Sequence, residues 1–429
     1  MKSRRCMRCW LMLLAFAAPL SARSENWPQW RGPQSDGISN EKGTPTEWGR
    51  EKNVLWRVPL PGPAGATPVV WEDRIYLTTT DAAKVDLICI STGGKQLWRE
   101  TIGEGSQNVR DDEGNYASPS PATDGERVIG FMGTGDLACF EMDGKVLWRL
   151  DIDEKYGPLN IQFGMASTPV LDKGRLYLQL IHGDGDPKTE EARVVCLDAK
   201  TGNEIWQSKR LTNAKMECEH AYTSPFLYRF GDLEYLLTHG GDFAIAYGLD
   251  DGKELWRCGG MNPPAPGGYH DTFRMVASPG ISEDLIVIPT AKNGPVLGVR
   301  PDGSGDITES DYFLWRMPQG TPDVSSPLIL DGLVYLVGER GFLTCLDAKT
   351  GKEIYRERTI DARHRASPVY VDSKIIIPSR NGNIMVVAPG REFKVLAIND
   401  MEEEISASPV ISNGVLYLRT FDALYAIGE

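Results

Sequence analysis

The chain has 429 residues, of which 41% are hydrophobic and 24% charged, with a formal net charge of −13 at pH 7. These values agree with a soluble, folded globule rather than a disordered chain. The acidic balance argues against nucleic acid or an anionic membrane surface as a partner. We expect a monomer with no transmembrane segment.

Residues 1–24 have the pattern of a signal peptide. Basic residues at positions 2, 4, 5 and 8 precede an apolar run at 10–20, which is too short to cross a bilayer as a helix. We therefore expect export to the periplasm or the extracellular space, with a mature start near Glu25.

Residues 25–52 are predicted to form an ordered arm that lies on the following domain. The segment Trp27–Pro33 is too rich in Gly, Pro and Trp to be a helix. Asn53–Val58 then reads as a strand and matches the later Leu-Trp-Arg strands at 97–99 and 147–149.

The domain at residues 53–429 is a repeat. A Ser/Thr-Pro step followed by a strand-like run recurs every 41 to 56 residues, at Thr67-Pro68, Ser118-Pro119, Thr168-Pro169, Ser224-Pro225, Ser278-Pro279, Ser326-Pro327, Ser367-Pro368 and Ser408-Pro409. Four short strands form one propeller blade at this period. The sequence therefore predicts an all-β fold, an eight-bladed β-propeller.

The two ends of this domain predict how the ring closes. The eighth unit stops after its third strand, at Leu424–Ile427. The strand at Val54–Val58 would supply the missing fourth strand and remove the exposed sheet edges of an open array.

A glycine stands four residues before an aromatic residue in five units, at Gly94/Trp98, Gly144/Trp148, Gly202/Trp206, Gly252/Trp256 and Gly351/Tyr355. Glycine adopts the positive φ of a tight hairpin without strain. We interpret the aromatic residues as packing anchors between blades rather than as a ligand cage.

The cysteines do not form a disulfide framework. Four of them occupy the same third-strand position in different blades, at Cys89, Cys139, Cys196 and Cys345, where a small apolar residue belongs. Cys218 and Cys258 lie near loop ends of one unit, and either form a disulfide or remain thiols.

Two segments carry a family resemblance. Leu197–Trp206 and Leu346–Tyr355 are similar to the Asp-Ala-x-Thr-Gly-x-x-x-Trp repeat of the pyrroloquinoline-quinone-type (PQQ-like) β-propeller family. The resemblance covers roughly residues 53–429, with weaker copies in the other units. It implies one of two classes: dehydrogenases of alcohols or sugars that use PQQ and calcium, or non-catalytic scaffolds such as the propeller lipoprotein of the outer-membrane barrel-assembly machinery.

Features of the dehydrogenase class are missing from the sequence. Those that resemble methanol dehydrogenase carry adjacent cysteines, and others a Cys-x-x-Cys-His haem motif; neither occurs here. A complete Asp/Glu/Asn calcium site does not map onto the chain either. We therefore expect a scaffold that binds a ligand or protein, without catalysis or cofactor. The alternative is a PQQ- and calcium-dependent oxidoreductase with an atypical site.

Long connections that emerge on one face of the propeller hold the candidate binding residues. Functional side chains concentrate on variable loops held by a rigid scaffold. We expect them to line a basic funnel near the ring axis that takes a small anionic ligand or a protein partner. The residues are Arg110, His220, His270, Arg274, Arg363, His364 and Arg365.

A metal site is not expected, although one segment offers donors. His182, Asp184 and Asp186 carry imidazole and carboxylate groups. Their spacing matches no established metal loop, and Gly-Asp turns are common between strands.

The cysteine assignment can be tested by chemical labelling. If Cys89, Cys139, Cys196 and Cys345 fill equivalent core positions, all four should react with a thiol reagent only after denaturation, even in exported protein. Peptide mapping that found any two of them bridged would show that the assumed strand register is wrong.

Overall fold

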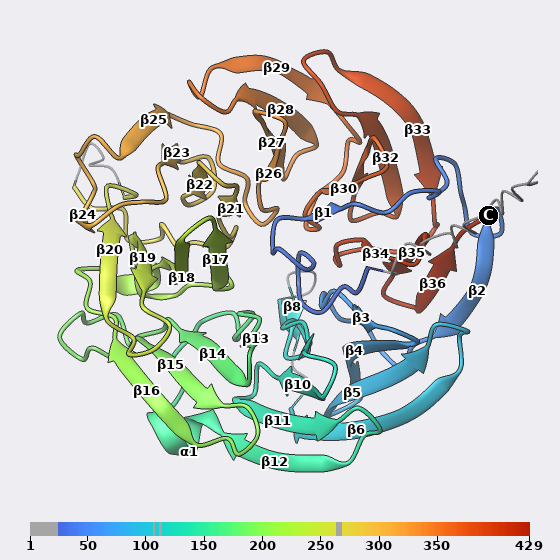
Figure 1. Ribbon diagram of the computed structural model, residues 1–429, viewed down its shortest axis with the longest axis horizontal. Coiled ribbons are helices and arrows are strands. Elements are labelled where there is room, and N and C mark those ends of the chain that lie inside the picture. The colour runs from blue at the N-terminus through green and yellow to red at the C-terminus, as the bar shows by residue number, and fades with distance from the viewer. Residues whose placement is uncertain (1–24, 106–107, 111–113, 263–267) are drawn as a thin grey trace, which may run out of the picture.

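Eight β-sheets surround a central axis like the blades of a propeller (Figure 1). The computed structural model describes residues 25–429 except 106–107, 111–113 and 263–267, so the predicted signal peptide lies outside the described residues. Each blade contains four strands in antiparallel order. The predicted all-β, eight-bladed propeller is confirmed.

The blades follow the chain. Blades 1 to 4 contain β3 (Val69–Trp71), β4 (Arg74–Asp81), β5 (Lys84–Ser91) and β6 (Gln96–Glu104); β9 (Ala122–Thr123), β10 (Arg127–Phe131), β11 (Asp136–Glu141) and β12 (Val146–Asp151); β13 (Val170–Asp172), β14 (Arg175–Leu180), β15 (Arg193–Asp198) and β16 (Glu204–Lys209); β17 (Phe226–Phe230), β18 (Leu233–Gly240), β19 (Phe243–Tyr247) and β20 (Glu254–Cys258). Blades 5 to 8 contain β21 (Gly280–Ile281), β22 (Ile286–Pro289), β23 (Val296–Val299) and β25 (Phe313–Met317); β26 (Leu328–Leu330), β27 (Leu333–Gly338), β28 (Phe342–Asp347) and β29 (Glu353–Arg358); β30 (Val369–Val371), β31 (Lys374–Pro378), β32 (Asn383–Ala388) and β33 (Lys394–Asp400); β34 (Val410–Ser412), β35 (Val415–Arg419), β36 (Ala423–Ile427) and β2 (Val54–Pro59).

Several short strands lie outside the four-stranded pattern of the blades. β1 (Ile38–Ser39) pairs with β30, β24 (Gly305–Asp306) pairs with β20, and β7 (Asn108–Arg110) pairs with β8 (Gly114–Asn115). A short helix, α1 (Ile152–Tyr156), follows β12, and a 3-10 turn spans Met216–Glu219.

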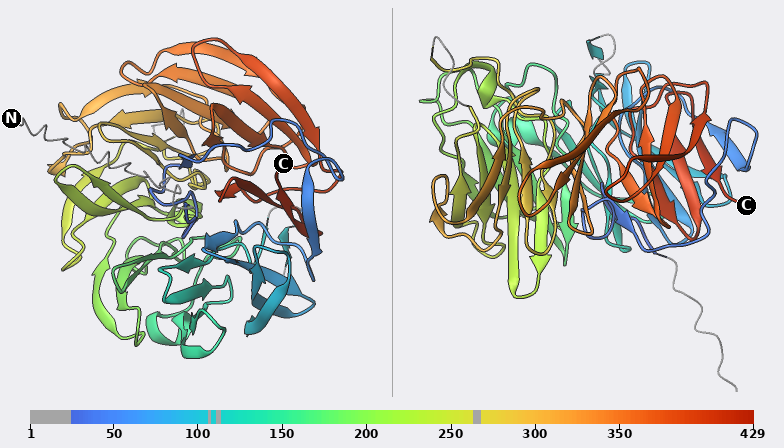
Figure 2. Two further views of the ribbon diagram at one scale, coloured as in Figure 1. Left: turned by 45° about the vertical axis from the view of Figure 1, so that its right-hand side comes forward. Right: turned by 90° about the horizontal axis from the view of Figure 1, so that it is seen from above.

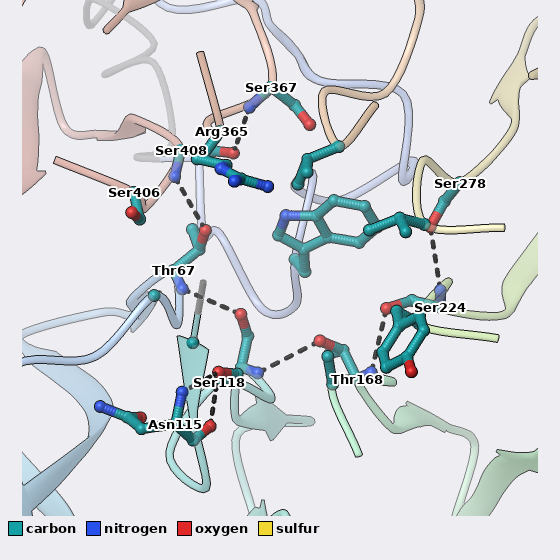
Figure 3. A pocket seen from close by; sticks show the side chains of 18 of the residues that line it. Thr67, Asn115, Ser118, Thr168, Ser224, Ser278, Arg365, Ser367, Ser406 and Ser408 are labelled. Atoms are coloured by element: carbon teal, nitrogen blue, oxygen red, sulfur yellow. Dashed lines mark hydrogen bonds between the residues drawn. The ribbon is translucent and has the colours of Figure 1, made fainter. Parts of the chain in front are cut away.

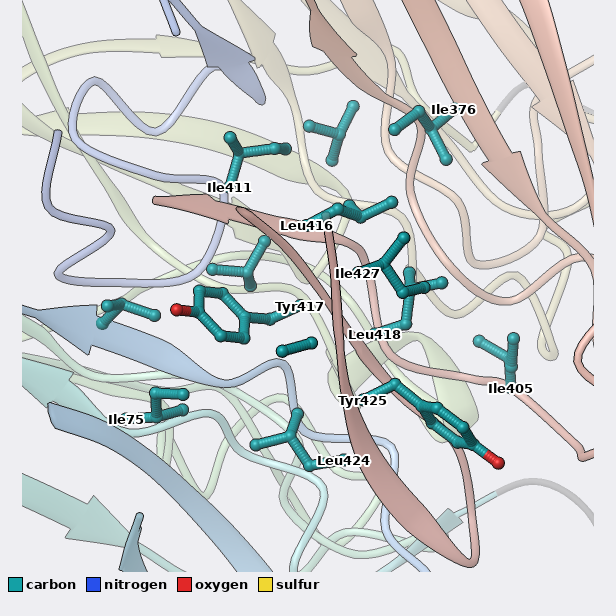
Figure 4. Packing of buried hydrophobic residues seen from close by; sticks show 14 of the residues in the cluster. Ile75, Ile376, Ile405, Ile411, Leu416, Tyr417, Leu418, Leu424, Tyr425 and Ile427 are labelled. Carbon is teal, nitrogen blue, oxygen red and sulfur yellow. The ribbon is translucent and has the colours of Figure 1, made fainter. Parts of the chain in front are cut away.

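The predicted closure is confirmed. Figure 1 shows the blue β2 beside the red β36, and the antiparallel register joins Val54 to Ile427 and Val58 to Leu424. A cluster of buried residues from blades 1, 7 and 8 packs behind this junction, including Ile75, Ile376 and Leu416 (Figure 4). The N- and C-terminal parts of the domain thus share one core, which stabilises the closed ring.

A circle of hydrogen bonds joins the inner strands (Figure 3). The backbone N–H of a Ser or Thr in each blade donates to the side-chain hydroxyl of the equivalent residue in the next blade, at 2.9 to 3.1 Å. The members, in order, are Thr67, Ser120, Thr168, Ser224, Ser278, Ser326, Ser367 and Ser408, and the last donates back to Thr67. A proline follows each one, and the inner strand begins directly after that proline.

The structure corrects one repeat position. In blade 2 the residue in the circle is Ser120, followed by Pro121, and not the predicted Ser118. Ser118 instead exchanges hydrogen bonds with the backbone of Asn115 in the preceding loop. The sequence contains two consecutive Ser-Pro pairs here, at 118–119 and 120–121. They look alike in the sequence, and only the hydrogen-bond partners in blades 1 and 3 show which serine belongs to the circle.

The aromatic residues of the fourth strands dock onto the next blade, as predicted. The indole N–H of Trp98 donates to the backbone oxygen of Met142 at 3.1 Å, and that of Trp148 to Ala199 at 2.9 Å. A Cβ on Gly144 would lie 2.8 Å from the Trp98 ring, so glycine is needed for this contact as well as for its φ of 94°.

The third-strand cysteines lie directly opposite these aromatic residues. Cys89 pairs with Trp98, Cys139 with Trp148, Cys196 with Trp206, and Cys345 with Tyr355. A small side chain there leaves room for the large ring. All six cysteines of the described residues, Cys218 and Cys258 included, are buried free thiols, and burial raises the pKa of the Cys139 thiol to about 12.

The arm at residues 25–52 crosses one end of the ring. Trp27 is buried and exchanges two backbone hydrogen bonds with Val70 in blade 1, at 2.8 Å each. The buried Arg31 guanidinium donates to the backbone oxygens of Pro327 and Asp36, at 2.8 and 2.7 Å. In the side view of Figure 2 the blue arm lies on the face opposite to the β7–β8 hairpin.

Two serine substitutions test the hydrogen-bonded circle. Ser120→Ala removes the acceptor of the buried Thr67 N–H and should lower the free energy of unfolding by about 1–3 kcal/mol. Ser118→Ala is the matched control and should cost less, because Ser118 is half-buried and water can replace its local contacts. Denaturant unfolding of both variants measures the difference, and an equal loss would contradict the assignment of Ser120.

Candidate binding cavity on the propeller axis

A cavity of about 390 Å³ lies on the axis of the ring. Seven of the eight residues in the hydrogen-bonded circle contribute to its wall, and Figure 3 shows several of them surrounding it. Each of their hydroxyl oxygens already accepts a backbone N–H, which leaves the hydroxyl proton as a donor. The circle that holds the blades together therefore also makes the cavity wall polar.

Aromatic side chains make the rest of the wall partly apolar. Trp30 of the arm lines the cavity and stacks on Phe226, with ring centroids 5.7 Å apart. Phe163, Tyr222 and Phe421 come from three different connections around the ring. The wall thus combines rings that can pack against an apolar group with hydroxyls that can bind a polar one.

Three arginines in the wall are each held next to a carboxylate. Arg274 pairs with Glu217 at 3.0 Å and lies 4.7 Å above the Phe163 ring. Arg380 pairs with Glu404 at 2.7 Å and lies 4.1 Å above the ring of Phe421.

Arg365 lies between two acids, 3.8 Å from Asp323 and 3.7 Å from Glu339. Lys292 also contacts both of these carboxylates. The basic funnel expected from the sequence is therefore replaced by a wall of ion pairs, because each loop that brings an arginine meets a neighbouring loop that brings an acid.

The structure brings two of the predicted site residues into the cavity, Arg274 and Arg365. Arg363 lies instead in a separate crevice with Lys292 and Arg358. His270 is exposed and stacks on Phe273, and His220 is half-buried with its Nε2 3.1 Å from the Gly183 oxygen.

Arg110 ends β7, and its side chain lies outside the described residues. His364, predicted to line the mouth, is buried within its own connection. Its Nδ1 lies 3.0 Å from the Ala362 oxygen and its Nε2 lies 3.3 Å from the Thr359 hydroxyl. These local partners hold the ring inside the blade, so that prediction is corrected.

The weak metal candidate is not assembled either. His182 is buried, whereas Asp184 and Asp186 are exposed, and Asp184 caps the backbone N–H of Asp186 in a turn. Across the described residues, no group of three or more His, Cys, Asp or Glu side chains is placed to hold a metal ion.

Sequence reasoning missed Arg380 and Phe421. Both lie in connections between a second and a third strand, at β31–β32 and β35–β36. The sequence prediction rested on the long connections, whereas these two are short turns between strands.

A family model described as outer membrane protein assembly factor BamB matches the chain in overlapping segments at residues 39–178, 83–259, 133–310 and 244–428. The chain belongs to this family of PQQ-like propeller repeats. Outer membrane protein assembly factor BamB of Burkholderia pseudomallei is 21% identical over 83% of the chain and 82% of the relative. BamB of Yersinia pestis is 22% identical over 75% of each.

Solved structures of both expected classes share the fold. BamB from Moraxella catarrhalis covers 88% of this chain and 97% of that protein at a TM-score of 0.62, with 11% identity. Quinohemoprotein alcohol dehydrogenase from Comamonas testosteroni covers 94% and 80% at a TM-score of 0.71, with 12% identity. A europium-containing methanol dehydrogenase covers 94% and 98% at a TM-score of 0.68 and 11% identity. At these identities the likeness extends to the fold alone.

The cavity residues do not fit PQQ with calcium. Calcium takes six to eight oxygen ligands, usually with several carboxylates. The acids of the wall, Asp323 and Glu404, are engaged by Lys292, Arg365 and Arg380. The described part of the wall therefore offers hydroxyl oxygens but no converging set of free carboxylates for the cation.

The structural role of His364 has a pH signature. Burial lowers its folded pKa to about 4 from an ordinary value of 6.5. Between these values the unfolded state binds a proton that the native state does not, so stability falls as the pH is lowered below 6.5. From pH 7 to pH 5 this histidine should cost about 2 kcal/mol.

Urea unfolding at the two pH values measures this effect. His364→Gln should lose less stability than the wild type on acidification, because glutamine does not take up a proton on unfolding. An unchanged pH dependence in the His364 variant would show that its ring is not buried neutral.

Proposed function

We propose that this protein is an exported scaffold that captures an extended segment of a partner protein in the axial cavity, without catalysis of its own. The main observation is the mixed chemistry of the cavity wall. Aromatic rings with an arginine above them lie beside the Ser and Thr hydroxyls of the hydrogen-bonded circle. An apolar side chain can pack on the rings while the backbone of the segment bonds to hydroxyl and guanidinium groups.

Other observations support a scaffold over the oxidoreductase alternative. The arginines and acids of the wall neutralise one another, which suits recognition of a peptide more than retention of a polyanionic quinone with calcium. Two curated relatives are assembly factors by name. The described residues contain no helix long and apolar enough to cross a membrane, and export rests on the pattern of residues 1–24.

Site-specific photo-crosslinking tests the proposal. A photoreactive residue at Ser406, in the cavity wall, should form adducts with a partner in cells of the source organism. The same residue at Lys200, in the exposed β15–β16 turn of the opposite face, is the matched control and should form few.

Removing the two aromatic platforms should weaken capture. Phe163→Ala with Phe421→Ala should reduce crosslinking at Ser406 several-fold while leaving the fold intact, because both rings are only half-buried. Equal adducts at both positions would move the binding surface away from the axis. Retention of quinone absorbance after desalting from PQQ and calcium, with dye-linked oxidation of an alcohol, would instead establish the oxidoreductase alternative.

A further inference from the structure

A second cavity, of about 340 Å³, lies between blades 3 and 4, whose strands are neighbours in Figure 1. We call it the interblade pocket. It shares no lining residue with the axial cavity. Its polar wall includes His182, Glu191, Arg210, Glu219 and Arg257.

His182 lines this pocket without a hydrogen-bond partner. The side chain is 2% exposed, and neither ring nitrogen has a hydrogen-bond partner in the part of the chain that the structure describes. The nearest carboxylate oxygen, on Glu191, is 3.6 Å from Nδ1, and both Glu191 oxygens already accept from the Asn160 amide. Burying an imidazole without partners is costly, so such a group calls for a ligand.

Arg210 is the second unbalanced group. It follows β16 and is 3% exposed, and it donates to the Phe243 oxygen at 2.6 Å and to the Thr238 hydroxyl at 3.5 Å. Among the described residues it forms no ion pair within 4 Å, and the carboxylates of Glu254 and Asp242 favour its charge only from beyond that distance. Burial lowers its pKa to about 10, so it remains charged at neutral pH.

The other arginine of the wall shows the contrast. Arg257 is held by both oxygens of Glu254, at 2.5 and 2.6 Å. Arg210 therefore carries a buried positive charge without a carboxylate in direct contact. Glu254 is engaged by Arg257 and Asp242 by Tyr269, so a bound anion would compensate the charge of Arg210 more fully.

We propose that the interblade pocket binds a small organic carboxylate of the size of an amino acid or a hydroxy acid. Its carboxylate accepts hydrogen bonds from Arg210, and a further polar group meets His182. The volume is at the small end of the range of ligand pockets. Glu219, whose Oε2 accepts the Gly185 N–H at 2.6 Å, lies in the same wall and offers a partner for an ammonium group.

Calorimetric titration of the full chain tests this proposal with acetate, glycine, L-alanine, L-lactate and succinate as separate probes. At least one acid should bind saturably. Arg210→Gln and His182→Leu should each weaken that binding at least tenfold, as loss of a charge-assisted or buried hydrogen bond predicts. Arg274→Gln, in the axial cavity, is the control and should bind like the wild type.

The arms of the titration separate the two kinds of acid. Binding of alanine but not lactate assigns the second polar contact to an ammonium group, and the reverse assigns it to a hydroxyl group. If Arg210→Gln does not fold, a wild-type crystal soaked with the best acid must show it beside Arg210. No binding at millimolar concentration, unchanged binding in both pocket variants, or density elsewhere overturns the proposal. None of these outcomes depends on capture at the axis.

Discussion

Eight backbone N–H groups near the axis find their acceptor outside their own blade, in the hydroxyl of the equivalent residue of the next blade. This circle sets the spacing of the inner strands, because every member is both donor and acceptor. A proline directly after each member has no N–H to satisfy and leads into the inner strand. The cavity wall follows from the same arrangement, since the hydroxyls that accept these bonds surround the axis.

The outer part of the ring is held by a different interaction. An aromatic ring from one blade covers a glycine of the next, and its indole N–H bonds to a backbone oxygen there. A cysteine or another small residue opposite the ring makes room for it. Each blade is thus attached to the next at two distances from the axis, by hydroxyl groups near the axis and by aromatic residues at the outer strands. The rigid scaffold that results allows the loops at the axis to vary.

Charge is balanced differently in the two cavities. At the axis every arginine of the wall has a carboxylate beside it, so a partner must compete with or share existing pairs. Between blades 3 and 4, within the described residues, Arg210 has no carboxylate in direct contact and His182 has no hydrogen-bond partner. The first arrangement suits a segment with mixed chemistry, and the second suits a small acid.

The sequence by itself determined the period, the number of blades and the closure by residues 54–58, because these depend on patterns repeated along the chain. It also determined the packing role of Trp98 and its equivalents, since the neighbouring glycine and the small residue opposite recur with them. Tertiary structure decided which of Ser118 and Ser120 joins the circle, because their hydrogen-bond partners lie some fifty residues away in other blades. It also decided that His364 is buried while Arg380 faces the cavity, and that Arg274 meets Glu217. Side chains from separate loops meet only when the blades are assembled, and no local pattern specifies which of them will be neighbours.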